Sequence, residues 1–222
     1  MSKVAAKGPK SELPLFRERR INDPGRALRQ LASEARNCTR CDLCKNATQT
    51  VFGEGPADAH LMLVGEQPGD QEDLAGRPFV GPAGRVLDAA LEAAGIVRSD
   101  VYITNAVKHF KNEPRGKRRI HKKPDTREID LCRFWLDNEM EIVRPRVVVA
   151  LGATAARGLM RRAMTINANR GRLIALAGGG QAVITVHPSY LLRLQEERDK
   201  RREFDLLVKD LRMAGQAAHT VA

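Results

Sequence analysis

The chain has 222 residues, of which 42% are hydrophobic and 4% aromatic, and its 38 Lys and Arg residues outweigh 27 Asp and Glu residues to give a formal net charge of +11. This length and apolar content are typical of one folded domain, and no apolar run approaches the ~18–20 residues that a membrane span needs. The positive charge favours a polyanionic partner such as nucleic acid, whereas the scarcity of aromatic residues argues against an extended platform that stacks many bases.

Residues 1–25 are basic, rich in Gly and Pro, and without helical or strand periodicity, so we expect a mobile N-terminal arm. The N-terminal sequence lacks the apolar core of a secretory signal, which predicts a cytoplasmic, intracellular protein. We expect the folded domain to span residues 26–214, with residues 215–222 as a C-terminal tail.

The folded region alternates between helical and strand patterns. Apolar residues at helical spacing predict helices near 25–36, 83–94, 153–162 and 198–213, and a capping box predicts another over 125–143. Short β-like runs predict strands at 61–65, 101–107, 146–151 and 182–186, with a shorter candidate at 172–176. This alternation predicts an α/β fold, a three-layer α/β/α sandwich with a central, mainly parallel β-sheet. Residues 108–124 form a long, charged segment, which is typical of a functional or disordered loop.

The segment that begins at Gly65 directly follows the apolar run of a predicted strand. In an open α/β sheet, ligands bind at the carboxyl ends of the strands. Gly65 allows the backbone to approach a ligand closely, and Glu66, Gln67 and Asp70 supply polar groups. The alternative is a polar loop that caps the following helix.

Four cysteines lie at positions 38, 41, 44 and 132. In an intracellular chain this spacing indicates metal or cluster binding rather than disulfides. The residues alone favour a four-cysteine site and leave open whether it holds a [4Fe–4S] cluster or zinc.

Several motifs together resemble the uracil-DNA glycosylase superfamily, specifically its iron–sulfur branch, family 4. In chain order they cover residues 38–41, 65–69, 76–84, 104–108 and 187–193. Two departures from the family 4 pattern, Gln67 in the third place of its Gly-Glu-Ala/Gly-Pro-Gly motif and the basic insertion at 117–121, resemble the UdgX subgroup. The resemblance implies a monomeric enzyme that excises uracil from single- or double-stranded DNA.

Five residues have the chemistry that a pocket for one flipped base requires. Phe79 offers a stacking face, and the side-chain amide of Asn105 can pair with the uracil edge and mismatch cytosine. His187 can donate to the uracil oxygen that becomes negative as the glycosidic bond breaks. Ser189 and Arg193 are expected to contact the DNA backbone, although Arg193 can equally face solvent. The alternatives are a core Phe, a strand-end cap and a structural His.

Gln67 occupies the place where the best-known branch of the superfamily has an Asp that positions the attacking water, and an amide cannot act as a base. His121 is therefore a candidate nucleophile, provided that its loop folds over the pocket and Glu66 orients the imidazole. By itself, His121 fits a solvated basic stretch that contacts phosphates, as we expect for Arg118 and Arg119. The resemblance to UdgX implies instead that His121 stays joined to the deoxyribose C1′ after uracil leaves.

The resemblance also implies the ligands of a structural [4Fe–4S] cluster. His109 stands at the family's third cysteine position, so the expected ligands are Cys38, Cys41, His109 and Cys132, with Cys44 as a spare thiol or alternate ligand. Two rival functions remain at this point: a turnover family 4 glycosylase that releases a free abasic site, and a non-enzymatic iron–sulfur or zinc protein that binds nucleic acid.

Overall fold

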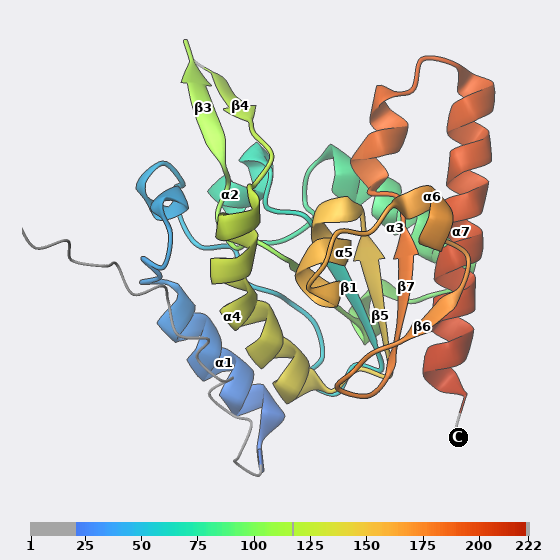
Figure 1. Ribbon diagram of the computed structural model, residues 1–222, viewed down its shortest axis with the longest axis horizontal. Coiled ribbons are helices and arrows are strands. Elements are labelled where there is room, and N and C mark those ends of the chain that lie inside the picture. The colour runs from blue at the N-terminus through green and yellow to red at the C-terminus, as the bar shows by residue number, and fades with distance from the viewer. Residues whose placement is uncertain (1–20, 117, 221–222) are drawn as a thin grey trace, which may run out of the picture.

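The computed structural model describes residues 21–116 and 118–220. Its centre is a five-stranded sheet in the order β2-β1-β5-β7-β6 (Figure 1). The strands are β1 (Leu61–Gly65), β2 (Val101–Asn105), β5 (Val147–Leu151), β6 (Leu173–Ala175) and β7 (Gln181–Thr185). Neighbouring strands are parallel except for β6, which pairs antiparallel with β7 at one edge.

Helices cover both faces of the sheet, which confirms the predicted three-layer α/β/α sandwich. One face packs against α1 (Pro24–Ala35), α4 (Thr126–Val143) and α5 (Ala153–Met160). The other face packs against α3 (Pro82–Ala94) and α7 (Glu197–His219). The strands are apolar on both sides, and in β1 the side chains of Met62 and Val64 enter one core while those of Leu61 and Leu63 enter the other.

Five short helical segments and a hairpin complete the described chain. They are η1 (Asp42–Lys45), α2 (Asp70–Ala75), η2 (Arg98–Asp100), α6 (Ile166–Asn169) and η3 (Pro188–Arg193), together with the hairpin of β3 (Asn112–Arg115) and β4 (Arg118–His121). The hairpin replaces much of the loop predicted at 108–124 and stands above α2 and α4 in Figure 1. No helix within 21–116 and 118–220 is long and apolar enough to cross a membrane.

The ends of the chain require two corrections. Helix α1 already begins at Pro24, within the expected arm, because the Asp23 side chain caps it by accepting from the Arg26 amide at 2.8 Å. The rest of that arm, residues 1–20, lies outside the described residues. At the other end, α7 continues through residues 215–219 of the expected tail because Ala214 and Ala218 are buried against the sheet.

Candidate active site

Most of the predicted site residues meet in one cavity of about 1060 Å³. It lies beyond the carboxyl ends of the parallel strands, where open α/β sheets bind ligands. Nine of the predicted residues line it: Glu66, Gln67, Asp70, Phe79, Asn105, His121, His187, Ser189 and Arg193. They come from the end of β2, from the segments that follow β1 and β7, including α2 and η3, from the loop before α3 and from the hairpin, so segments far apart in the sequence form a single cavity.

The floor of this cavity is shaped to hold a flat polar ring. A Cβ atom at Gly65 would lie 2.3 Å from Asn105 Oδ1 and 2.6 Å from Phe79 Cζ, so only glycine leaves room there. Asn105 is 2% exposed, and its Oδ1 has no hydrogen-bond partner among the described residues. A buried acceptor without a partner is costly unless a ligand supplies the donor.

Phe79 holds its place through an unusual backbone conformation. Its φ is 54°, in the left-handed region that non-glycine residues rarely adopt. The chain can pack around it because residue 84 is glycine, since a Cβ there would lie 1.9 Å from the Phe79 carbonyl oxygen. The Phe79 ring stacks on His187, with centroids 5.7 Å apart and an interplanar angle of 28°. Backbone strain at a ligand-facing ring is typical of a functional position.

His187 is held in one tautomer. Its Nδ1 accepts from the Ser189 backbone N–H at 3.2 Å, so the proton of the neutral ring is on Nε2. Burial is the main factor that lowers the pKa of His187 to about 4, and the nearby Arg193 and His121 lower it further. The ring is therefore neutral at physiological pH and has one N–H donor available.

Gln67 ties the hairpin to the end of β1. Its Oε1 accepts from the Lys111 backbone N–H at 3.0 Å, which fixes the orientation of the carboxamide. Its Nε2 then donates to the Lys122 carbonyl at 2.9 Å and to His121 Nε2 at 2.9 Å. Because His121 Nε2 accepts this bond, the lone pair of that nitrogen points toward Gln67.

Glu66 lies beside the same imidazole nitrogen. Its Oε1 is 3.4 Å from His121 Nε2, and its Oε2 accepts from the Thr154 hydroxyl at 2.5 Å. Thr154 is buried at the start of α5 and orients this carboxylate. The sequence analysis missed Thr154, although the Gly-Ala-Thr turn directly after strand β5 was a signal for it.

Arg118 and Arg119 do not line the cavity. Arg119 Nε donates to Asp70 Oδ1 at 2.7 Å, and the Arg119 guanidinium also pairs with the buried Asp73. Arg119 thus fastens β4 to α2, and Asp70 is part of this attachment. Arg118 is exposed beside the hairpin turn.

A buried ion pair supports the floor from below. The Lys108 ammonium is fully buried and donates to Glu139 Oε2 at 2.6 Å and to the Asn105 carbonyl at 2.7 Å. Glu139 also accepts from the hydroxyls of Tyr102 and Thr104, each at 3.0 Å. Burial and the neighbouring Glu139 raise the pKa of Tyr102 well above its usual range. This network anchors the end of β2, which carries Asn105.

The cysteines form a separate cluster beside α4. Burial is the main factor that raises the pKa of Cys132 to about 12, and the neighbouring Cys38 and Cys41 raise it further. Two N–H groups point at sulfur: the Lys108 amide lies 3.1 Å from Cys132 Sγ, and Trp135 Nε1 lies 3.1 Å from Cys38 Sγ. Such N–H···S contacts suit thiolate ligands of a cluster.

His109, the expected fourth ligand, fits a cluster less well than the three cysteines do. His109 is buried, and its Nε2 is hydrogen-bonded to Thr50 Oγ1 at 2.9 Å. Cys44 is partly buried and close enough to Cys41 to raise the pKa of that thiol. Across the described ranges, no three His, Cys, Asp or Glu side chains are arranged to hold a metal ion. The types of donor atom therefore fit an iron–sulfur cluster, but the described side chains are not arranged around a common point where a cluster could bind.

Known proteins resemble this chain over most of its length. The uracil DNA glycosylase superfamily matches residues 52–212. A type-4 uracil-DNA glycosylase of Thermotoga maritima is 42% identical over 78% of this chain and 88% of its own length. A type-4 enzyme of Pyrobaculum aerophilum is 39% identical over 75% and 85%, and a type-5 enzyme of that organism is 30% identical over 70% and 79%. The chain therefore belongs to the uracil DNA glycosylase superfamily.

Proposed function

We propose that this protein excises uracil from DNA, and the observation that carries the proposal is the unpartnered Asn105 Oδ1. Uracil N3–H can donate to this oxygen while its O4 accepts from the same side-chain amide. Cytosine carries an acceptor at N3 and a donor at C4, so the amide rejects it. The curated relatives bearing the name uracil-DNA glycosylase support the same assignment.

His187 has the properties needed for the leaving group. As the bond between C1′ and N1 breaks, its electron pair moves onto uracil and negative charge develops on the uracil oxygens. The Nε2–H of neutral His187 can stabilise one of these oxygens, with Phe79 stacked between the base and the pocket wall. Arg193, whose guanidinium donates to Ser189 Oγ at 3.1 Å, is positioned for the DNA backbone.

We also propose that His121 captures the sugar. Gln67 cannot remove a proton from water, and its amide presents the Nε2 of His121 beside Glu66. The Nε2 lone pair gives up its hydrogen bond with the Gln67 amide and forms a bond to C1′ as uracil leaves, Glu66 stabilises the imidazolium, and the Nδ1 proton then passes to solvent. After this proton is lost, cleavage of the new bond would have to expel an imidazolate anion, which is a poor leaving group, so the adduct persists.

The rival within the same class is a turnover glycosylase, and the type-4 names of the relatives favour it. In that mechanism Glu66 orients water toward C1′, and His121 is only part of the basic hairpin. The DNA product is then a free abasic site. The third reading, a nucleic-acid-binding protein without activity, predicts no release of uracil at all.

For the cluster, we propose Cys38, Cys41 and Cys132 as ligands, completed by His109 or by Cys44. A [4Fe–4S] cluster would stabilise the fold around α4, because ligand binding is coupled to folding. Cys132→Ala should therefore lose iron and stability, whereas Cys44→Ala should keep both if His109 is the fourth ligand. Iron content and thermal unfolding of the two variants measure this directly.

Denaturing electrophoresis of the protein incubated with uracil-containing DNA separates the three readings. We expect an SDS-resistant protein–DNA band with wild type, and with His121→Ser we expect release of uracil and a free abasic site but no such band. An adduct of undiminished yield in His121→Ser would rule out capture by His121. Uracil release without an adduct in wild type would establish the turnover reading, and no release would exclude both enzymes.

A further inference from the structure

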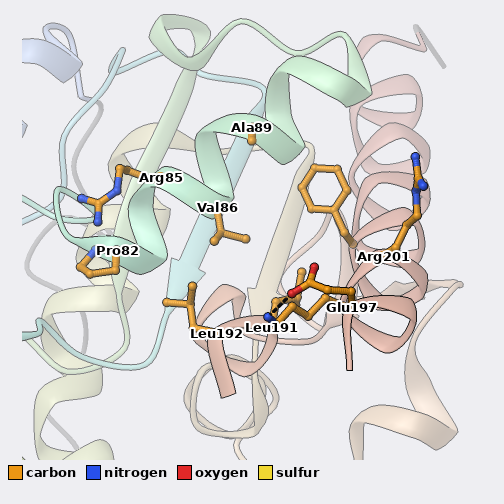
Figure 2. Close-up of a pocket in the computed structure, with 10 residues that line it drawn as sticks. Pro82, Arg85, Val86, Ala89, Leu191, Leu192, Glu197 and Arg201 are labelled. Carbon is orange, nitrogen blue, oxygen red and sulfur yellow. Dashed lines mark hydrogen bonds and ion pairs between the residues drawn. The ribbon is translucent and has the colours of Figure 1, made fainter. Parts of the chain in front are cut away.

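A second cavity of about 690 Å³ lies beside the active site, between α3, η3 and the start of α7 (Figure 2). Its lining is largely apolar. Val86 and Ala89 belong to α3 and face Leu191 and Leu192 of η3, as Figure 2 shows, and Phe204 adds an aromatic ring from α7. This volume is in the range of small-molecule and nucleobase sites.

Cations border this apolar surface. Arg85 and Arg201 lie on opposite sides of the cavity in Figure 2, and both are exposed. Neither forms an ion pair with a residue in the described part of the chain, in contrast to Lys200, which pairs with Glu197 at 2.5 Å. The cavity thus combines an apolar floor with two arginines whose charges are not neutralised, a combination suited to a flat apolar ring that carries an anionic group.

The cavity adjoins the active site. Pro82 and Leu192 line both cavities, so a nucleotide next to one bound in the active site is within reach of the second cavity. A nucleic acid strand repeats a flat base and a phosphate at every step. Bases in a duplex are stacked and paired, so only an unpaired nucleotide can place its base in such a cavity.

On the basis of the proposed function, we propose that this cavity is a second nucleotide subsite. It holds an unstacked base of single-stranded DNA near the flipped uridine, with the base against Phe204 and Val86 and the adjacent phosphates at Arg85 and Arg201. The substrate class is therefore DNA that is single-stranded on at least one side of the uracil. Contact with a base stacked on an aromatic ring and with two phosphates is sufficient to strengthen binding measurably.

Binding of a non-cleavable substrate tests this subsite without relying on activity. Single-stranded oligonucleotides carrying 2′-fluoro-2′-deoxyuridine are made with one flanking nucleotide on each side, or extended by several nucleotides on the 5′ or the 3′ side. We expect one of the extensions to tighten the Kd by roughly tenfold in fluorescence anisotropy, and a complementary strand on that side to abolish the gain. Arg85→Ala/Arg201→Ala should remove this gain, and Phe204→Leu should remove part of it.

The control variant Arg29→Ala/Lys209→Ala removes two exposed positive charges outside both cavities and should keep the gain. Thermal unfolding of each variant checks that the fold is intact. The proposal is overturned if neither extension tightens the Kd of wild type. It is also overturned if the extension tightens the Kd equally in Arg85→Ala/Arg201→Ala and in the control variant. Uracil release from the short deoxyuridine oligonucleotide is measured in parallel, so failure of the glycosylase assignment is seen separately from failure of the subsite.

Discussion

Asn105 and His121 face the same cavity, yet Asn105 is 2% exposed whereas the His121 side chain is 50% exposed. The floor that carries Asn105 is held by the parallel sheet and by a buried ion pair. The hairpin that carries His121 is held by side-chain contacts from Gln67 and Arg119. Under the proposed function, recognition of the base and the fate of the sugar therefore depend on separate parts of the molecule, which can be disrupted one at a time.

The largest effect is expected on stability, from a change in the buried ion pair below the cavity floor. Lys108→Met leaves the Glu139 carboxylate buried without its cation, and loss of one partner of such a pair costs about 3–5 kcal/mol in the free energy of unfolding. Urea unfolding measures this cost. The matched double variant Lys108→Met/Glu139→Leu should recover much of the stability, because it buries no unpaired charge. A loss below about 1 kcal/mol in the single variant would show that the pair does not support the floor.

A change at the floor itself should affect chemistry rather than stability. Asn105→Ala should lose about 2–4 kcal/mol of transition-state stabilisation, equivalent to roughly 30- to 1000-fold in the rate of uracil release. Its unfolding midpoint should change little, because Asn105 Oδ1 has no partner to lose within the described chain. Single-turnover release of free uracil is the measurement, and an unchanged rate would mean that this amide does not read the base.

A smaller effect is expected on the hairpin side. Thr154→Val keeps the shape of the side chain but removes the donor to Glu66, so the carboxylate beside His121 is less well oriented. We expect the rate of adduct formation to fall about tenfold, as for the loss of one hydrogen bond to a charged group, with binding of DNA unchanged. Thr154→Ser keeps the hydroxyl and should restore the rate. Equal rates in the Val and Ser variants would contradict the positioning role.

The last effect concerns the pH dependence of stability. The pKa of His187 is lowered from an ordinary value of 6.5 to about 4, so between these pH values the unfolded chain binds a proton that the folded chain does not. The contribution of His187 to stability is therefore fully present above pH 6.5 and declines as the pH falls toward 4. NMR titration of the imidazole tests the pKa directly. His187→Gln should show a shallower loss of unfolding temperature over this range.

Local sequence patterns were sufficient to predict the layers, whereas the set of residues expected around the cavity came largely from the resemblance to the glycosylase superfamily. The strands at 61–65 and 147–151 are continuous apolar runs, and Glu66, Asn105 and His187 follow such runs at the edge where parallel strands end. The hairpin was missed because both of its strands are polar and mostly exposed, so no alternating pattern marks them. Gly116, with a φ of 60°, was the one turn signal.

Contacts between distant segments could not be predicted in the same way. Lys108 and Glu139 are separated by 31 residues, and nothing local in either segment indicates that they pair in the core. The same holds for Thr154 and Glu66, separated by 88 residues. The attachment of Arg119 to α2 was missed for another reason: an arginine in a basic run has the same sequence signature whether it binds phosphate or a carboxylate of its own chain.

The carboxamide of Gln67 makes the two chemical routes mutually exclusive at this position. The hairpin uses both halves of the group, the oxygen toward the Lys111 amide and the nitrogen toward the Lys122 carbonyl and His121. A carboxylate has no N–H, so an Asp or Glu at position 67 would face the Lys122 carbonyl with repulsion and could not donate to His121. Under the proposed mechanism, a change from capture by His121 to activation of water at residue 67 therefore requires a change in the hairpin as well.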